Sequence, residues 1–149
     1  MNAFVAAGAG FLAAVLWFDL MFDVQVARHR DGVLPEAVLA SIAAYYARVT
    51  TSARPMNRLI ATVMLATLAA IVVEIVHGHP ALWIDLTSLA LAVPAIALAG
   101  GRIVPSAVRL GTRADTPEHK SALARSIFRG HVLCLAAMVG VLIMQLGFG

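Results

Sequence analysis

The chain has few of the residues on which secreted domains, metalloproteins and nucleic-acid-binding proteins depend. Its single cysteine, Cys134, lies in an apolar run, which excludes disulfides within the chain and metal sites built on several cysteines. Charged residues make up only 13% of the chain, and no basic stretch is interleaved with aromatic residues as on nucleic-acid-binding surfaces. The sequence also has no phosphate-binding glycine loop and no nucleophilic triad. We therefore expect no nucleic-acid partner, and the residues indicate no particular cofactor.

Apolar side chains dominate what is there. They make up 61% of the 149 residues, and the mean hydropathy of +0.89 lies outside the range of water-soluble proteins. Four apolar runs each approach the roughly 20 residues that span a bilayer, once a helical turn is added at each end. We predict a single all-α domain, residues 1–149, in which four transmembrane helices form an antiparallel bundle surrounded by lipid. The runs are residues 4–18, 59–73, 86–101 and 132–144.

The positive charges are distributed unevenly. All eleven lysines and arginines fall within residues 28–58 and 102–129. Because cationic loops stay on the cytoplasmic side, we expect these two stretches inside and both termini on the outer side. The first residues lack a positively charged segment, so we expect the first span to be retained rather than cleaved as a signal peptide. These features predict a multi-pass protein of the cytoplasmic (inner) membrane.

Residues 35–51, between the first two spans, have the pattern of an amphipathic helix. Pro35 suits the first turn of a helix. We predict a helix that lies on the cytoplasmic surface of the membrane. Further along the chain, Pro94 and Pro105 predict kinks in the third span, and Asp115 or Thr116 is expected to cap a long fourth helix. The apolar residues of the amphipathic segment are Leu39, Ile42, Tyr46 and Val49.

Two carboxylates close the first span. Asp19 and Asp23 are four residues apart and therefore share one face of a helix. Carboxylates at membrane depth are costly unless they are paired, and arginine is the natural partner because its planar fork bonds a carboxylate at two points. If the topology holds, several polar residues of the other helices lie at the same level. They are Asn57, Arg58, Arg102, Arg125, Arg129 and His131.

This inner cluster has two readings. In the first, its ion pairs lock the bundle together and fix its register. In the second, Asp19, Asp23 and His131 are catalytic acid–base groups that act on a hydrophobic small molecule. Its ligand-binding residues would then be Asn57, Arg58, Arg102, Arg125 and Arg129.

A second group of polar residues lies at the outer face. Glu74 and His77 form a Glu-x-x-His pair, a spacing that places both side chains on one side of a helix in carboxylate-bridged metal proteins. His79 and Asp85 could complete a coordination sphere for a metal ion. A metal is nevertheless not favoured, because dinuclear sites require this motif twice, and histidines in exposed loops are common without one.

Four stretches of the chain together form a pattern: LWFDLMFD at 16–23, YARVTT at 46–51, RPMNRL at 54–59 and RSIFRGH at 125–131. With these stretches the chain resembles a family of four-span membrane proteins that includes the anthrone oxygenases. The resemblance implies a four-helix bundle and, in some members, cofactor-independent oxygenation of a polycyclic aromatic compound. It also implies functional roles for Asn57, Arg58, Arg129 and His131.

The leading hypothesis is therefore a membrane protein that binds or transforms a hydrophobic small molecule at the inner cluster. One alternative is a structural or accessory subunit that docks, as a homo-oligomer or in a larger membrane complex, through small residues of the first span. A transporter or channel component is the other, although the middle of the spans offers only Thr62, Thr67 and Pro94 to a polar path. The small residues are Ala6, Gly10 and Ala14.

Overall fold

The computed structural model describes residues 2–29, 31–52, 54–78 and 81–148. Every regular element in these ranges is helical, and four segments are long and apolar enough to cross a membrane, so the predicted all-α, four-span class is confirmed. These segments are Ala3–Arg28, Pro55–Val76, Leu82–Thr112 and Pro117–Gly147. The elements are α1 (Asn2–Asp23), η1 (Val24–Arg28), α2 (Glu36–Ala47), η2 (Arg48–Ser52), α3 (Arg54–Val76), α4 (Leu82–Leu98), η3 (Ala99–Ile103), α5 (Val104–Thr112) and α6 (Pro117–Gly147).

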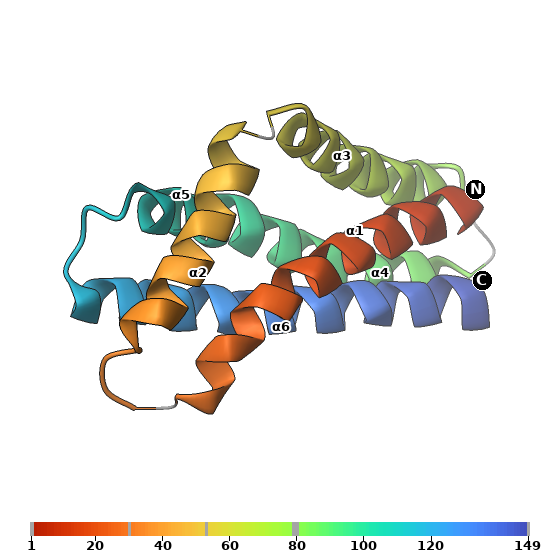
Figure 1. Cartoon of the computed structure of the whole chain (residues 1–149). Helices are drawn as coiled ribbons and strands as arrows, with labels where there is room; N and C mark the ends of the chain where they lie inside the picture. The colour runs from red at the N-terminus through yellow and green to blue at the C-terminus, as the bar shows by residue number, and fades with distance from the viewer. Residues whose placement is uncertain (1, 30, 53, 79–80, 149) are drawn as a thin grey trace.

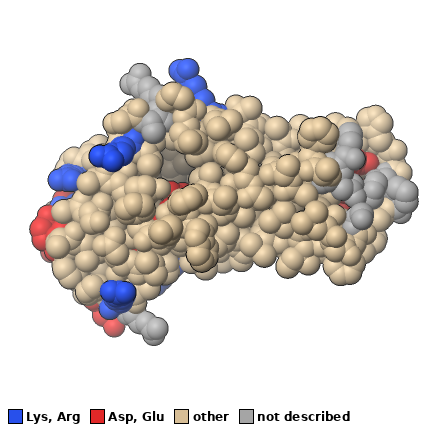
Figure 2. All heavy atoms as spheres, turned by 45° about the vertical axis from the view of Figure 1, so that its right-hand side comes forward, with Lys and Arg blue, Asp and Glu red and all other residues tan. Residues whose placement is uncertain are grey.

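The spans pack around the long helix α6. Helices α1 and α4 both pack against α6, and α3 packs on α1 and α4, on their side away from α6 (Figure 1). The two chain ends lie at the same end of the bundle (Figure 1). Lysine and arginine side chains gather at the opposite end, which we call the basic end (Figure 2). The predicted segregation of charge along the bundle is therefore present in the fold.

Helix α2 crosses the bundle at the basic end (Figure 1). It begins directly after Pro35, whose carbonyl accepts hydrogen bonds from the backbone N–H groups of Val38 and Leu39. The apolar face of α2 packs mainly on α5 and also on α6, so the predicted surface helix covers protein with this face. Its buried residues are Leu39, Ile42, Ala43 and Tyr46.

The third span is helical throughout, and its two α-helical parts, α4 and α5, are joined by the π-helical turn η3. Pro105 has no N–H to offer the carbonyl four residues earlier, and its ring crowds that carbonyl. The N–H of Val104 instead bonds the carbonyl of Ala99, five residues back, which is the π-helical pattern. The predicted irregularity at Pro105 is thus a π turn, whereas α4 runs through Pro94.

The last helix begins as its sequence indicates. Thr116 occupies the cap position, its hydroxyl accepts from the backbone N–H of His119 at 3.4 Å, and Pro117 is the first helical residue. Just before it, Arg109 donates two hydrogen bonds to the carboxylate of Asp115, at 2.8 and 2.9 Å. Of the two capping residues considered, Thr116 is therefore the cap, and Asp115 ties α5 to the turn.

Glycines allow close helix approaches at particular points. A Cβ atom at Gly111 would lie 2.9 Å from the backbone nitrogen of Ala47, so α5 meets the end of α2 with no space for a side chain. In the small-residue stripe of α1, Ala6 is buried and Gly10 faces Leu142 of α6. Only Ala14 of that stripe is exposed, so most of it serves packing inside the bundle.

We expect Gly111→Ala to lower the free energy of unfolding by about 1–3 kcal/mol, since the added methyl group can be accommodated only by shifting backbone. Chemical unfolding in detergent micelles measures this change. Gly100→Ala is the matched control, because a Cβ atom at Gly100 meets nothing within 4 Å. Equal stability of the two variants would contradict the close approach of α2 and α5.

Candidate functional site

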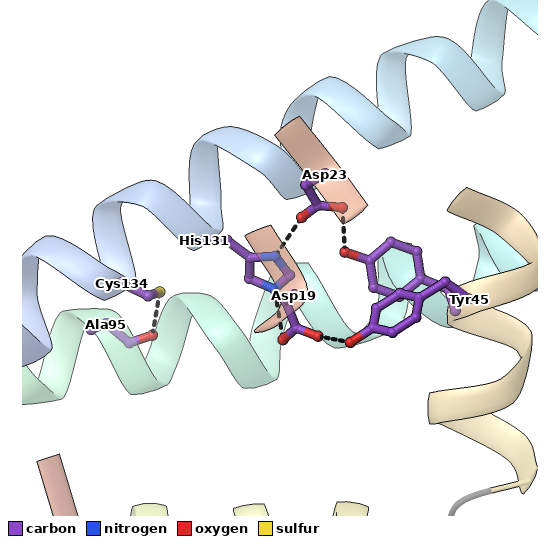
Figure 3. A network of polar contacts seen from close by, with 7 residues as sticks. Asp19, Asp23, Tyr45, Ala95, His131 and Cys134 are labelled. Carbon is purple, nitrogen blue, oxygen red and sulfur yellow. Dashed lines mark hydrogen bonds and ion pairs between the residues drawn. The ribbon is translucent and has the colours of Figure 1, made fainter. Parts of the chain in front are cut away.

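A buried polar cluster joins α1 to α6 near the basic end. Asp19 and Asp23 lie one turn apart on α1, and His131 of α6 lies between their carboxylates (Figure 3). The Nδ1 atom of His131 is 2.7 Å from Oδ2 of Asp23, and its Nε2 atom is 3.8 Å from Oδ2 of Asp19. The side chains of Asp23 and His131 are 1% and 6% exposed, whereas that of Asp19 is 19% exposed. One imidazole therefore serves both acids.

Two neighbouring tyrosines of α2 complete the cluster. The hydroxyl of Tyr45 donates to Oδ1 of Asp19 at 2.5 Å, and the hydroxyl of Tyr46 donates to Oδ1 of Asp23 at 2.7 Å. The ring of Tyr45 also stacks on Phe22 of α1, with 4.0 Å between centroids. Each carboxylate thus has a phenol on one oxygen and the imidazole nearest the other. The cluster connects three helices.

Burial and the adjacent carboxylates keep both phenols protonated. Desolvation is the largest cause that raises the pKa of Tyr45, followed by its hydrogen bond to Asp19. Desolvation also dominates the raised pKa of Tyr46, followed by the negative charge of Asp23. In both residues the ionised phenolate is disfavoured, because it would be poorly solvated and would face a like charge. The tyrosines are therefore hydrogen-bond donors throughout the physiological pH range.

The predicted arginine partners of the two aspartates are not the observed ones. Arg125 donates to the backbone carbonyls of His29 and Gly32, at 3.2 and 2.6 Å. Among the side chains that the structure describes, no arginine pairs with Asp19 or Asp23. At about 100° per residue, Arg129 is rotated roughly 200° around α6 from His131 and is directed elsewhere. Asn57, Arg58, Arg102 and Arg129 are exposed.

Sequence reasoning missed Tyr45 and Tyr46, which we had not assigned to the cluster. The signal was present at Tyr46, because it lies on the apolar face of the amphipathic segment. A tyrosine that faces inward must find a partner for its hydroxyl group, and the costly carboxylates of Asp19 and Asp23 were candidate acceptors.

The residues predicted at the outer face lie at the other end of the bundle. Glu74 and Asp85 are buried, at 3% and 0% exposure, whereas His77 is exposed and its Nδ1 atom contacts the carbonyl of Val73 at 2.8 Å. His79 lies outside the described residues. Within the described ranges no three His, Cys, Asp or Glu side chains gather as metal ligands. The four-residue metal site stays a prediction.

The part of the chain that the structure describes has two cavities outside the polar cluster of Asp19, Asp23 and His131. One, of about 540 Å³, lies between α1 and α3 and is almost wholly apolar. The other, of about 400 Å³, lies at the basic end between the region after α1 and α6. Neither of these cavities is lined by Asp19, Asp23 or His131. At the cluster, Asp19 bonds Tyr45, and Asp23 bonds both Tyr46 and His131, so the observed hydrogen bonds run between side chains of the cluster itself.

One family model matches the chain. It is the SHR3 chaperone model, described as ER membrane protein SH3, and it matches residues 1–148. No curated protein and no solved structure gives a significant match. The family match contradicts the resemblance to the anthrone oxygenases, which was therefore wrong, and the roles carried over on that basis lose their support. The predicted cytoplasmic (inner) membrane location was also wrong, because the matched family is one of ER membrane proteins.

We expect Tyr46→Phe to lower the free energy of unfolding by about 1.5–3 kcal/mol, because it removes a hydrogen bond to a buried carboxylate. Tyr45→Phe is the matched control and should cost less, since Asp19 is partly exposed and water can replace the lost phenol. Chemical unfolding of both variants in detergent micelles gives the comparison. A smaller cost for Tyr46→Phe than for Tyr45→Phe would argue against the cluster as described.

The two tyrosines also allow a direct pH measurement, because the chain has no others. We expect no tyrosinate absorbance from the folded protein at about pH 11, where a free phenol is mostly ionised. Because the pKa of each phenol is higher in the folded protein, their stabilisation is complete below about pH 10 and is lost as the pH rises through the folded-state pKa. Ultraviolet titration of folded and unfolded protein tests this. Ionisation of one phenol near pH 10 without unfolding would refute it.

Proposed function

Because the chain belongs to the SHR3 chaperone family of ER membrane proteins, we propose that it is a membrane-embedded accessory protein whose partners are other membrane-spanning proteins. This favours the accessory-subunit alternative over the small-molecule hypothesis. The structural feature that supports it best is the apolar cavity between α1 and α3, which is wide enough to receive side chains of another helix. We call it the α1–α3 groove.

The composition of the groove suits a helix as its occupant. Helices in lipid gain little from hydrophobic burial, so they associate where small residues let backbones approach closely. The hydroxyl group of Thr67 bonds the carbonyl of Val63 at 2.7 Å, and the groove therefore offers almost no polar group to a hydrophilic ligand. Small residues from both helices line it and are open to a partner: Ala7 of α1, and Ala66, Ala69 and Ala70 of α3. Gly8 also lines it, but the space over Gly8 is filled by Thr67 of α3.

The position of α3 adds a second argument. Helix α3 packs on α1 and α4 at the side of the bundle away from α6, so one of its faces is available to lipid or to a partner (Figure 1). Large apolar side chains border the groove. Phe4 and Phe11 extend from α1, and Leu59 and Val73 extend from α3. A helix that enters the groove would exchange lipid contacts for well-packed contacts with these residues.

We propose a structural role for the polar cluster within this function. Asp23 is bonded by Tyr46 and His131, and Asp19 by Tyr45, which leaves few free positions for a substrate. Two acids and one imidazole at this depth stabilise the fold only while they remain together, because removal of one partner of a buried pair typically costs about 3–5 kcal/mol. The cluster would thus hold α2 and α6 on α1 while α3 meets the partner.

Photo-crosslinking in ER membranes tests the proposal. A photoreactive residue in place of Ala66, which is exposed in the groove, should form adducts with spanning segments of newly made membrane proteins. These adducts should decline during a chase as the partners mature. The matched position is Ala90, which is exposed on α4 outside the groove, and it should react chiefly with lipid. Protein adducts of equal yield at both positions, or none from Ala66, would overturn the proposal.

A variant that fills the groove gives an independent measurement. Ala66→Phe should weaken association with the crosslinked partners by about 1–3 kcal/mol, as expected when bulk is forced into a packed contact. Ala90→Phe adds the same bulk elsewhere and should leave association unchanged. Thermal unfolding of both variants in detergent confirms that the bundle itself is intact.

A further inference from the structure

The second cavity has a character different from that of the α1–α3 groove. It has a volume of about 400 Å³ and lies at the basic end, between the residues that follow α1 and the third and fourth turns of α6. We call it the basic pocket. Its lining combines charged and apolar side chains: Val26, Ala27, His29, Asp31, Arg125, Phe128 and Arg129.

The polar groups of the basic pocket leave donors unused. Arg125 bonds two backbone carbonyls through Nη2, but its Nε–H is buried and has no hydrogen-bond partner in the described chain. Arg129 is exposed and forms no ion pair or hydrogen bond with any described residue. His29 contacts the carbonyl of Gln25 at 3.3 Å through Nδ1. Asp31 is the one acid among the lining residues, so two guanidinium groups face a single carboxylate.

The apolar part of the lining indicates what kind of anion would fit. Val26, Ala27 and Phe128 form walls beside the two arginines. The pocket lies between the basic ends of the spans Ala3–Arg28 and Pro117–Gly147, outside the apolar runs 4–18 and 132–144. Because those apolar runs are the parts expected in the hydrocarbon core, we place the pocket nearer the headgroups. A free ion would use only the charged part of such a pocket, whereas a phospholipid could use both parts.

We propose that the basic pocket binds the phosphate group of an anionic phospholipid. The exposed guanidinium of Arg129 donates to the phosphate oxygens, the positive charge of Arg125 attracts the phosphate from the neighbouring turn of α6, and the glycerol and first acyl carbons lie against Phe128. Guanidinium groups suit this role because they bond phosphate oxygens through fixed pairs of donors and keep their charge. Basic pockets between spans at the cytoplasmic side are a recurrent solution for lipid headgroups. The site is separate from the α1–α3 groove and does not depend on a protein partner.

Binding of defined lipids to the full purified chain tests the proposal. Native mass spectrometry of detergent-purified protein, with phosphatidic acid or phosphatidylcholine of identical acyl chains added, should show preferential retention of phosphatidic acid. Arg129→Gln should weaken retention about fivefold, which corresponds to one arginine at a membrane surface. Arg129→Lys should lose less, since it keeps the charge but not the paired donors. The matched control, Arg58→Gln, removes an exposed arginine that does not line the pocket and should change nothing.

Competition by inorganic phosphate identifies the source of the phosphate. Displacement of phosphatidic acid by millimolar inorganic phosphate, dependent on Arg129, would mean that the pocket recognises the phosphate group alone. Retention of the lipid under these conditions would mean that its glycerol and acyl chains contribute. Either result supports the pocket. No preference for phosphatidic acid, or equal losses in Arg129→Gln and Arg58→Gln, would overturn it.

Discussion

The imidazole of His131 lies between two carboxylates that the apolar first span could not otherwise hold at membrane depth. An uncompensated carboxylate in lipid is costly enough to oppose insertion of the helix. His131 reaches Asp23 from α6, and the phenols of Tyr45 and Tyr46 reach the two acids from α2. The opening span is therefore compatible with lipid only when two other helices are in place. This requirement fixes how α1, α2 and α6 are arranged.

The rest of the basic end follows from the position of α2. Its phenols reach α1 while its end lies close to α5, an approach that Gly111 permits because it has no side chain. The same arrangement leaves Arg125 to bond the loop after α1 and leaves Arg129 without a partner among the residues that the structure describes. At the other side of the bundle, α3 takes no part in the cluster. It can accordingly meet another molecule without disturbing the polar contacts.

Composition and periodicity were sufficient to predict the four spans, the amphipathic helix and the start of the last helix at Asp115 or Thr116, because these depend on local physics. The partner of Asp23 was harder, since it depends on the rotation of α6. Arg129 and His131 are two residues apart but face nearly opposite directions, and arginine was expected as the partner because its planar fork bonds a carboxylate at two points. The sequence also could not predict in which cellular membrane the protein resides. The positive-inside rule applies to bacterial and ER membranes alike, so charge distribution could not distinguish them.

The π turn at Ala99–Ile103 determines which side chains of α5, the helix that follows it in the third span, face the bundle. Compared with an unbroken α-helix, it accommodates one additional residue and so rotates the downstream segment by about 100°. Ala107 and Leu110 thereby become the buried face of α5 beneath α2. The length of this short stretch is thus as constrained as the identity of a core residue. Loss of a single position there would turn the face under α2 toward the bilayer, although no contacting side chain had changed.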